Sequence, residues 1–163
     1  MKIIGIDPGL SGAIAVLENN KVLNIFDMPV MSEGKKNKRQ LNSALLVNLI
    51  KNNINSNEEV SVVVEQVNAM PGQGVTSMFN FGQTFGAIKG VCAALELPIF
   101  FVRPSKWKKH FELINSSKDS SRTKAIEMYP KLSNQLSKKK DVNKSDAILI
   151  ARFFNETRLS KEN

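Results

Sequence analysis

The chain has one cysteine, one histidine and no long apolar run. A single cysteine excludes an internal disulfide and a cysteine-based zinc site, and it fits a reducing compartment. Cys92 lies in an apolar stretch, which predicts a small buried side chain. The single histidine, His110, excludes a histidine metal cluster, and we assign it no role. No stretch approaches the run of about 20 apolar residues that a membrane span needs, and Asp7 interrupts any signal-peptide-like segment, so we expect no membrane partner.

Basic residues are in excess. The 163 residues carry a formal net charge of +8, whereas the apolar and charged fractions, 42% and 23%, are those of an ordinary globular protein. This length fits one domain with room for a core. The positive charge favours a polyanionic partner, most simply nucleic acid, although charge alone also fits a protein that is merely basic.

A carboxylate ends the first apolar run. Ile3, Ile4 and Ile6 predict a short buried strand, Asp7 follows them, and Pro8-Gly9 predicts a turn into a second strand over residues 12–17. A carboxylate at that depth is costly unless a cation or hydrogen bonds compensate it. We therefore interpret Asp7 as the centre of a metal or phosphate site.

Two further acids interrupt segments fit for burial. The β-branched run over residues 60–64 ends at Glu65, and Asp146 opens a last helix that is apolar nearly all round. Sites of α/β sheets are usually built at the carboxyl ends of the strands. Asp146 alternatively serves as a simple helix cap.

The three acids together indicate a metal site. Carboxylates gathered in one place repel one another unless cations lie between them, and oxygen ligands without histidine or cysteine favour magnesium or manganese. Two such ions about 4 Å apart activate water and stabilise the leaving oxygen of a phosphodiester. The alternative is that each acid is a local cap or turn residue.

The remaining pattern predicts one α/β domain with a mixed sheet, in the order β-β-β-α-β-α-β-α-α. A hairpin turns at Asn19-Asn20, helices start near residues 42, 76, 105 and 122, and a strand covers residues 97–102. Residues 32–39 predict a mobile loop that is either a solvated linker or an arm that contacts phosphates through Lys35, Lys36, Lys38 and Arg39.

Three glycines fall four apart in the long helix from Thr76: Gly82, Gly86 and Gly90. Each costs about 1 kcal/mol of helix stability relative to alanine. Another backbone in close contact would explain the stripe, either the sheet of this chain or the same helix of a second copy.

Several motifs occur in order from Lys2 to Phe153: Ile6-Asp7-Pro8-Gly9-Leu10-Ser11-Gly12, Val64-Glu65-Gln66-Val67, Phe81-Gly82-Gln83-Thr84-Phe85-Gly86 and, from Asp146, Asp-Ala-Ile-Leu-Ile-Ala. This collinear set resembles the RuvC family of Holliday junction resolvases. The stretches over residues 107–111, 118–122 and 138–141 most resemble the phage and plant-chloroplast branch of that family.

The resemblance implies an RNase H-like fold, with a mixed central sheet flanked by helices, as a single nuclease domain over residues 1–158 and a frayed tail over 159–163. It further implies a homodimeric endonuclease that resolves four-way DNA junctions by paired symmetric nicks leaving 5′-phosphates. The resemblance also implies two Mg²⁺ ions per active site, for which Mn²⁺ would be able to substitute. It implies no small-molecule cofactor. The expected location is the cytoplasm of a bacterial or phage-infected cell, with an organellar matrix as the alternative.

The resemblance also assigns site residues. Asp7 would be shared by both metals, Glu65 would bind one and Asp146 the other. The long helix from Thr76 matches the family's dimer interface, which favours dimerisation for the glycine stripe, and residues 68–74 match a wedge inserted into the junction. The expected DNA-binding residues are Lys106, Lys108, Lys109, Lys118, Arg122, Lys138, Lys139, Lys140, Met70, Gln73 and Phe79.

One position departs from the bacterial pattern, which has a further Asp or His three residues before the last acid. This chain has Asn143 there, an oxygen donor without charge. Asp141 lies nearby and would complete the catalytic metal site if its loop curls inward, although in a continuous helix it would point away from the face of Asp146.

Three other functions share part of this pattern. An ATP-binding module of the sugar-kinase and actin type has a similar opening strand, but it needs a second phosphate loop and a second domain. A junction-binding protein without nuclease activity is disfavoured by the intact Asp7, Glu65 and Asp146. A nuclease acting on other branched DNA or on RNA–DNA hybrids uses the same carboxylate chemistry.

Overall fold

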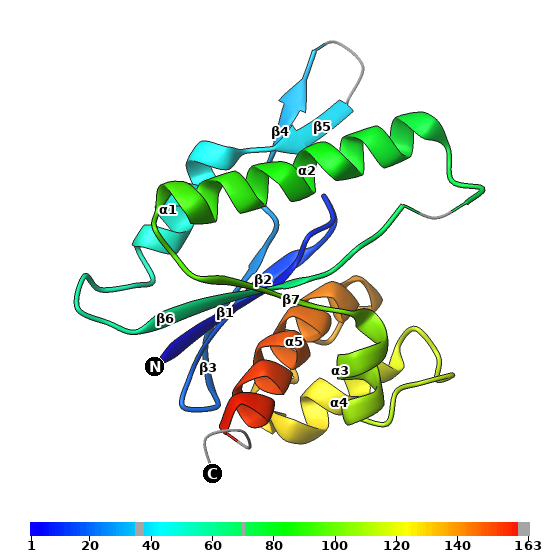
Figure 1. Ribbon diagram of the computed structural model, residues 1–163. Helices are drawn as coiled ribbons and strands as arrows, with labels where there is room; N and C mark the ends of the chain where they lie inside the picture. The colour runs from blue at the N-terminus through cyan, green and yellow to red at the C-terminus, as the bar shows by residue number, and fades with distance from the viewer. Residues whose placement is uncertain (35–37, 70, 160–163) are drawn as a thin grey trace.

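The computed structural model describes residues 1–34, 38–69 and 71–159. A five-stranded sheet in the order β3-β2-β1-β6-β7 forms its centre (Figure 1). β3, β2 and β1 pair antiparallel, whereas β1, β6 and β7 pair parallel, so the sheet is mixed as predicted. The strands are β1 (Lys2–Asp7), β2 (Ala13–Glu18), β3 (Lys21–Asp27), β6 (Val60–Glu65) and β7 (Ile99–Val102).

Helices cover both faces of the sheet. α1 (Ser43–Lys51) and α2 (Val75–Ala94) lie on one face, and α3 (Pro104–His110), α4 (Ser120–Met128) and α5 (Val142–Leu159) lie on the other (Figure 1). Two 3-10 turns, η1 (Pro130–Leu132) and η2 (Lys139–Asp141), connect α4 to α5. Among the described residues, no helix is long and apolar enough to cross a membrane.

The alternation of side chains along β1 divides the core in two. Ile4 and Ile6 join the cluster that faces α1 and α2, whereas Ile3 joins the cluster that faces α5. Because successive residues of a strand point to opposite faces, Gly5 and Asp7 share the α5 side with Ile3. The absence of a side chain at Gly5 lets α5 approach closely, since a Cβ built there would lie 2.2 Å from the carbonyl oxygen of Ala147.

Local sequence explains most element boundaries. Asn19 and Asn20 both have positive φ, 47° and 63°, as the predicted two-residue hairpin turn requires. Asn42 caps α1 by accepting a hydrogen bond from the Leu45 amide at 3.0 Å. Trp107 of α3 and Phe111, the residue after α3, are buried hydrophobic anchors, as predicted. Cys92 is also buried, as predicted.

Two predictions at the element level were wrong. The predicted loop over residues 32–39 is instead part of a hairpin of β4 (Val30–Glu33) and β5 (Lys38–Leu41), where Val30 pairs with Leu41; Lys35 and Lys36 lie outside the described residues. The last helix begins at Val142 instead of at Asp146, so Asp146 lies beyond its first turn and is no cap. The helix continues to Leu159, and the rest of the expected tail lies outside the described residues.

The glycine stripe of α2 does not pack against the sheet, which was one of its two predicted partners. Against the described part of the chain, a Cβ built at Gly82, Gly86 or Gly90 meets nothing within 4 Å. Near the start of the same helix, Val75 and Phe79 are also exposed, at 87% and 65%. Packing of the stripe against a second copy of the chain, the other predicted partner, stays a prediction.

Candidate active site

Neighbouring parallel strands deliver two carboxylates to one edge of the sheet. Ile6 of β1 pairs with Val64 of β6, so the next residues, Asp7 and Glu65, end adjacent strands. Val63 faces the α5 side of the sheet, and Glu65, two residues later, shares that face with Asp7. The sequence prediction that both acids stand at the carboxyl ends of buried strands is confirmed.

α5 brings the third acid to the same place. Asp146 precedes Ala147, whose carbonyl oxygen lies against Gly5 of β1. The close contact between helix and strand thus sets Asp146 on the α5 side of the sheet, beside the end of β1. Asp146 lies close enough to the other two acids for its negative charge to raise the pKa values of both Asp7 and Glu65.

Burial and like charge make this group electrostatically unfavourable when all three acids are ionised. Burial, with the charges of Glu65 and Asp146, raises the pKa of Asp7 to about 7. Burial also raises the pKa values of Glu65 and Asp146. Strongly shifted pKa values in a polar cluster are typical of functional sites.

Lysine side chains partly offset the negative charge. Lys108 of α3 lowers the pKa of all three acids, and Lys118 lowers that of Asp146. A backbone hydrogen bond from Gly9 further stabilises the Asp7 carboxylate. Lys108 and Lys118, predicted from the resemblance to bind DNA, therefore do lie near the acids.

The donor set fits a hard divalent cation. It consists of carboxylate oxygens, which Mg²⁺ and Mn²⁺ prefer. Among the described residues, Asp146 Oδ1 is a buried oxygen with no hydrogen-bond partner, which is a property expected of a cation ligand. In the same residues, however, no three Asp, Glu, His or Cys side chains are arranged so that they could hold one ion in the side-chain conformations of this structure.

Asp141 is not brought into the group. Its Oδ2 accepts a hydrogen bond from the Lys138 amide at 2.9 Å, and its Oδ1 contacts Lys144 Nζ at 3.2 Å. Burial would raise the pKa of Asp141, but these interactions lower it below its usual range. Both carboxylate oxygens are thus engaged in capping η2 and pairing with Lys144.

Asn143, and not Asp141, contacts the segment that carries Asp7. Its side-chain amide donates to the carbonyl oxygen of Ser11, in the turn that follows Asp7. Helical spacing places Asn143 and Asp146 three residues apart on the same side of α5. Which of the two residues, if either, completes the metal site stays a prediction.

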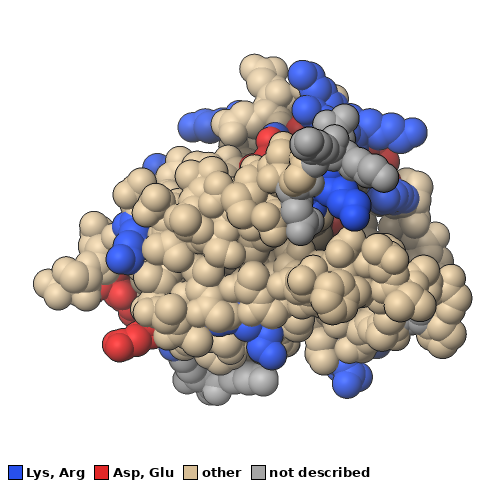
Figure 2. Space-filling model, turned by 90° about the horizontal axis from the view of Figure 1, so that it is seen from above, with Lys and Arg blue, Asp and Glu red and all other residues tan. Residues whose placement is uncertain are grey.

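A cleft of about 710 Å³ opens beside the acids. None of the three acids lines it, but it reaches the Leu10–Gly12 turn after Asp7, Asn143 of α5, and Lys118. Its basic side chains come from β5, the loop before α4, and η2, and they are Arg39, Lys118, Lys139 and Lys140. Figure 2 shows the largest group of basic side chains toward the upper right of the face seen from above, with others at its left and lower edges.

The cleft is positively charged despite two acids in its wall. Asp119 is held by Arg122 through two hydrogen bonds, of 2.7 and 2.6 Å, and Asp27 pairs with Lys144 at 3.3 Å. Among the described residues, Arg39, Lys118, Lys139 and Lys140 form no salt bridge. These four cations therefore remain available to an anionic ligand.

The other predicted DNA-binding residues are scattered. Lys106 and Lys109 are exposed on α3, Lys138 is exposed before η2, and Gln73 and Phe79 are exposed at the start of α2. Arg122 is engaged by Asp119, so its guanidinium is not free for phosphate. Met70 lies outside the described residues.

Sequence reasoning missed two contacts of the site. A hydrogen bond from Ser121 lowers the pKa of Asp146, and the indole of Trp107 donates a hydrogen bond to Glu65. Arg39, one of the residues of the predicted phosphate-contacting arm, reaches the cleft from β5. Ser121 lies within a run of helix-starting residues over 115–122, and this run gives no signal that one of its serines contacts an acid. Trp107 carries one, because a buried indole N–H needs a hydrogen-bond partner.

Comparison with solved structures identifies similar folds over the whole chain. RuvC of Thermus thermophilus matches at a TM-score of 0.56 with 18% identity, covering 97% of each chain. T. thermophilus RuvC in complex with a Holliday junction substrate matches at 0.59, with 16% identity and 96% coverage of each chain. The fowlpox virus Holliday junction resolvase matches at 0.51, with 17% identity and 100% coverage of each.

No protein-family model and no curated protein matches the chain. At these identities the structural likeness establishes the fold. The prediction of an RNase H-like fold, with a mixed central sheet flanked by helices, is therefore confirmed.

Proposed function

We propose that this protein is a RuvC-like endonuclease that resolves four-way DNA junctions by paired symmetric nicks leaving 5′-phosphates. The observation that carries the proposal is the grouping of Asp7, Glu65 and Asp146 on one sheet edge, beside a cleft lined by four cations. Holliday junction resolvases among the structural matches support it. The motifs over residues 107–111 and 118–122 support the phage and plant-chloroplast branch, which stays a prediction because the matches come from Thermus and fowlpox virus.

In this proposal the acids would hold two Mg²⁺ ions, or Mn²⁺ in their place. Asp7 would be shared by both ions, Glu65 would hold one and Asp146 the other. When bound, such ions would supply activation of water and stabilisation of the leaving oxygen of the phosphodiester. Lys108 and Lys118 contact the phosphate next to the acids, where their charge stabilises the negative charge that develops during cleavage.

The basic cleft binds the DNA backbone beside the cleaved bond. Arg39, Lys139 and Lys140, which line the cleft, would contact backbone phosphates, and Lys118 lines the same cleft and lowers the pKa of Asp146. Phosphate contacts of this kind position the DNA without reading its sequence.

A second copy of the chain completes the proposed enzyme, since paired nicks need two active sites. The exposed stripe of Gly82, Gly86 and Gly90 on α2 offers a surface on which another backbone can pack closely. Val75 and Phe79 extend this stripe with exposed apolar side chains.

Cleavage assays on three substrates test the proposal. We expect paired nicks in a mobile four-way junction with MgCl₂, and no cleavage of an RNA–DNA hybrid or plain duplex. Asp7→Asn should abolish cleavage while junction binding persists, because binding depends on the basic surface. Glu127→Gln, which removes a carboxylate that is 67% exposed on α4, is the matched control and should cleave normally.

Each other result selects a different function. Cleavage of the hybrid but not the junction would identify an RNase H-like activity on hybrids. Tight junction binding without cleavage in MgCl₂ or MnCl₂ would identify a binding protein.

The cleft is tested through salt dependence. The double variant Lys139→Ala/Lys140→Ala should weaken junction binding and reduce the slope of log K against log salt by about 0.9 for each phosphate that the protein no longer neutralises. Lys21→Ala/Lys51→Ala removes the same charge from exposed positions outside the cleft. Equal slopes for the two double variants would contradict the proposed path of the DNA.

A further inference from the structure

Trp107 is the only tryptophan of the chain, and its side chain is 0% exposed in the core between α3 and the sheet. The edge of its indole faces the acids, because Nε1–H donates a hydrogen bond to Glu65 Oε1 at 2.8 Å. A hydrogen bond to a charged acceptor in a dry environment is stronger than one between neutral groups. Glu65 thus satisfies a buried N–H that would otherwise be costly.

The face of the same indole holds a cation. Lys108 Nζ lies 5.3 Å from the centre of the Trp107 ring, within the range of a cation–π interaction. Lys108 is also the lysine whose charge acts on Asp7, Glu65 and Asp146 alike. One aromatic side chain therefore contacts both an acid and the lysine that faces the acids.

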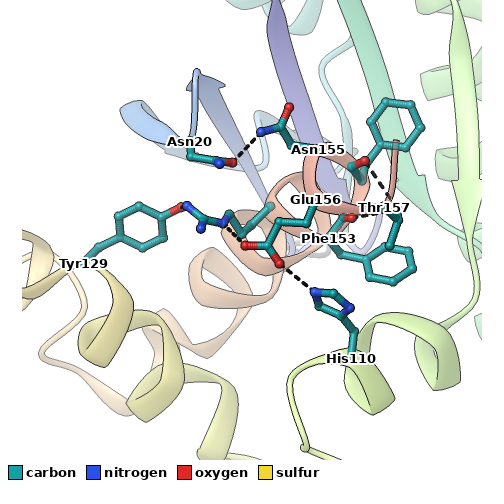
Figure 3. A network of polar contacts seen from close by, with 9 residues as sticks. Asn20, His110, Tyr129, Phe153, Asn155, Glu156 and Thr157 are labelled. Carbon is teal, nitrogen blue, oxygen red and sulfur yellow. Dashed lines mark hydrogen bonds and ion pairs between the residues drawn. The ribbon is translucent and has the colours of Figure 1, made fainter. Parts of the chain in front are cut away.

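α3 is itself fixed to α5, the helix that carries Asp146. His110 Nε2 lies 2.6 Å from Glu156 Oε2, and the His110 ring packs edge-on against Phe111 and Phe153. Glu156 also pairs with Arg152, which contacts the Tyr129 hydroxyl (Figure 3). This network ties the ends of α3 and α4 to α5, so Trp107 is held in place relative to Asp146.

We propose that Trp107 is a positioning residue that orients the Glu65 carboxylate and the Lys108 ammonium toward the reacting phosphate. The proposal rests on the metal-dependent nuclease activity proposed above. A free glutamate side chain loses conformational entropy when it is ordered. The indole N–H fixes one oxygen in advance, and the remaining lone pairs of the carboxylate stay available to a cation.

The hydrogen bond can be observed without any assay of activity. In a ¹H–¹⁵N spectrum, the single tryptophan gives a single indole N–H peak. We expect this peak to shift in Glu65→Gln and to move during titration of the wild-type protein with MgCl₂. Glu127→Gln should leave it in place. An indole peak that responds neither to Glu65→Gln nor to MgCl₂ would overturn the proposal.

Affinity for metal provides a second readout. Trp107→Phe keeps an aromatic ring in the core but removes the N–H donor. Titration calorimetry with MnCl₂ should show affinity reduced about 10-fold or more, as for other residues that orient metal ligands. Leu136→Val disturbs the packing of the same core cluster at a residue outside that network, and its affinity should match that of the wild type.

Kinetics separate positioning from stability. Trp107→Phe should lower kcat about 10-fold or more, with the KM for the junction little changed, because the substrate-binding cations remain. Replacement of Trp107 by benzothienylalanine, which keeps the shape of the indole but lacks N–H, should lower kcat equally. Normal kcat in the benzothienylalanine protein, or the same decrease in Leu136→Val, would show that Trp107 only fills space. If the wild-type protein cleaves no junction, the proposed function fails, and the indole peak and the MnCl₂ affinity still decide the role of Trp107.

Discussion

At the scale of single residues, Asp7 is where folding and the proposed function oppose each other. Its pKa is raised to about 7, so the folded protein binds a proton there more tightly than the unfolded chain does. Stability of the metal-free protein should therefore fall as pH rises from about 4 to 7. Asp7→Asn removes this charge and should raise the Tm at pH 8, by about 2–4 °C for each kcal/mol gained.

Scanning calorimetry in EDTA at several pH values checks this expectation. The gap in Tm between Asp7→Asn and the wild type should close below pH ~4, where the carboxyl group is protonated in both states. Added MgCl₂ should stabilise the wild type more than the variant. A wild type that is more stable than Asp7→Asn at pH 8 in EDTA would show that the group is compensated without metal.

The site was predictable from sequence only where a short-range rule applies. Asp7 and Glu65 each follow an apolar run, and strand alternation places them on one face. The surroundings of Asp141 were not predictable, because they depend on η2 and on Lys144, which no local pattern specifies. The Trp107–Glu65 bond likewise joins residues 42 positions apart.

At the scale of elements, the packing of α5 on β1 sets the distance between Asp146 and Asp7. Gly5→Ala should destabilise the protein by about 1–3 kcal/mol, because the new Cβ would lie 2.2 Å from Ala147 O and 2.8 Å from Ala151 Cβ. The displaced helix should also carry Asp146 away from Asp7. Thermal unfolding, with and without MgCl₂, should therefore show both a lower Tm and a smaller stabilisation by metal; an unchanged response to metal would separate α5 packing from the site.

The contact of α3 with α5 predicts a pH dependence away from the acids. Burial would raise the pKa of Glu156, but hydrogen bonds from His110 and Arg152 lower it. A carboxylate with a lowered pKa stabilises the fold above its unfolded pKa of about 4.3, and this contribution is lost as pH falls through the lower folded value. Glu156→Gln should thus lower the Tm at pH 7 and have little effect at acid pH. A difference in Tm that is independent of pH would contradict this role.

Most elements could be predicted because hydrophobic periodicity and turn residues agree, as at Asn19-Asn20 and in α1. The β4–β5 hairpin could not be predicted, because its pairing of Val30 with Leu41 and Ser32 with Arg39 flanks a polar stretch with three lysines and one glycine. Such a stretch is typical of a loop by composition. The start of α5 was misplaced because Val142 to Ser145 give no strong helix-start signal apart from the acid before them.

At the scale of the whole molecule, the net charge of +8 is unevenly placed with respect to the acids. The cations of the cleft come from segments far apart in sequence, and the fold brings them beside the carboxylates. The total charge can be read from the sequence alone, whereas this arrangement depends on the hairpin and on η2. Opposite charges in adjoining regions are what a metal-dependent enzyme on a polyanionic substrate needs.

The exposed glycine stripe of α2 leads to a prediction about stability and dimerisation. In a monomer, Gly82→Ala and Gly86→Ala should each stabilise the protein by up to about 1 kcal/mol, because alanine favours helix and the new Cβ has open space. In a dimer packed along the stripe, the same methyl groups hold the two backbones apart. We therefore expect the double variant to have a higher dimer dissociation constant in sedimentation experiments, with Lys51→Ala as an exposed control. A double variant that gains stability and associates as the wild type does would place the dimer interface elsewhere, and the regular spacing of glycines on α2 would then have no explanation in packing.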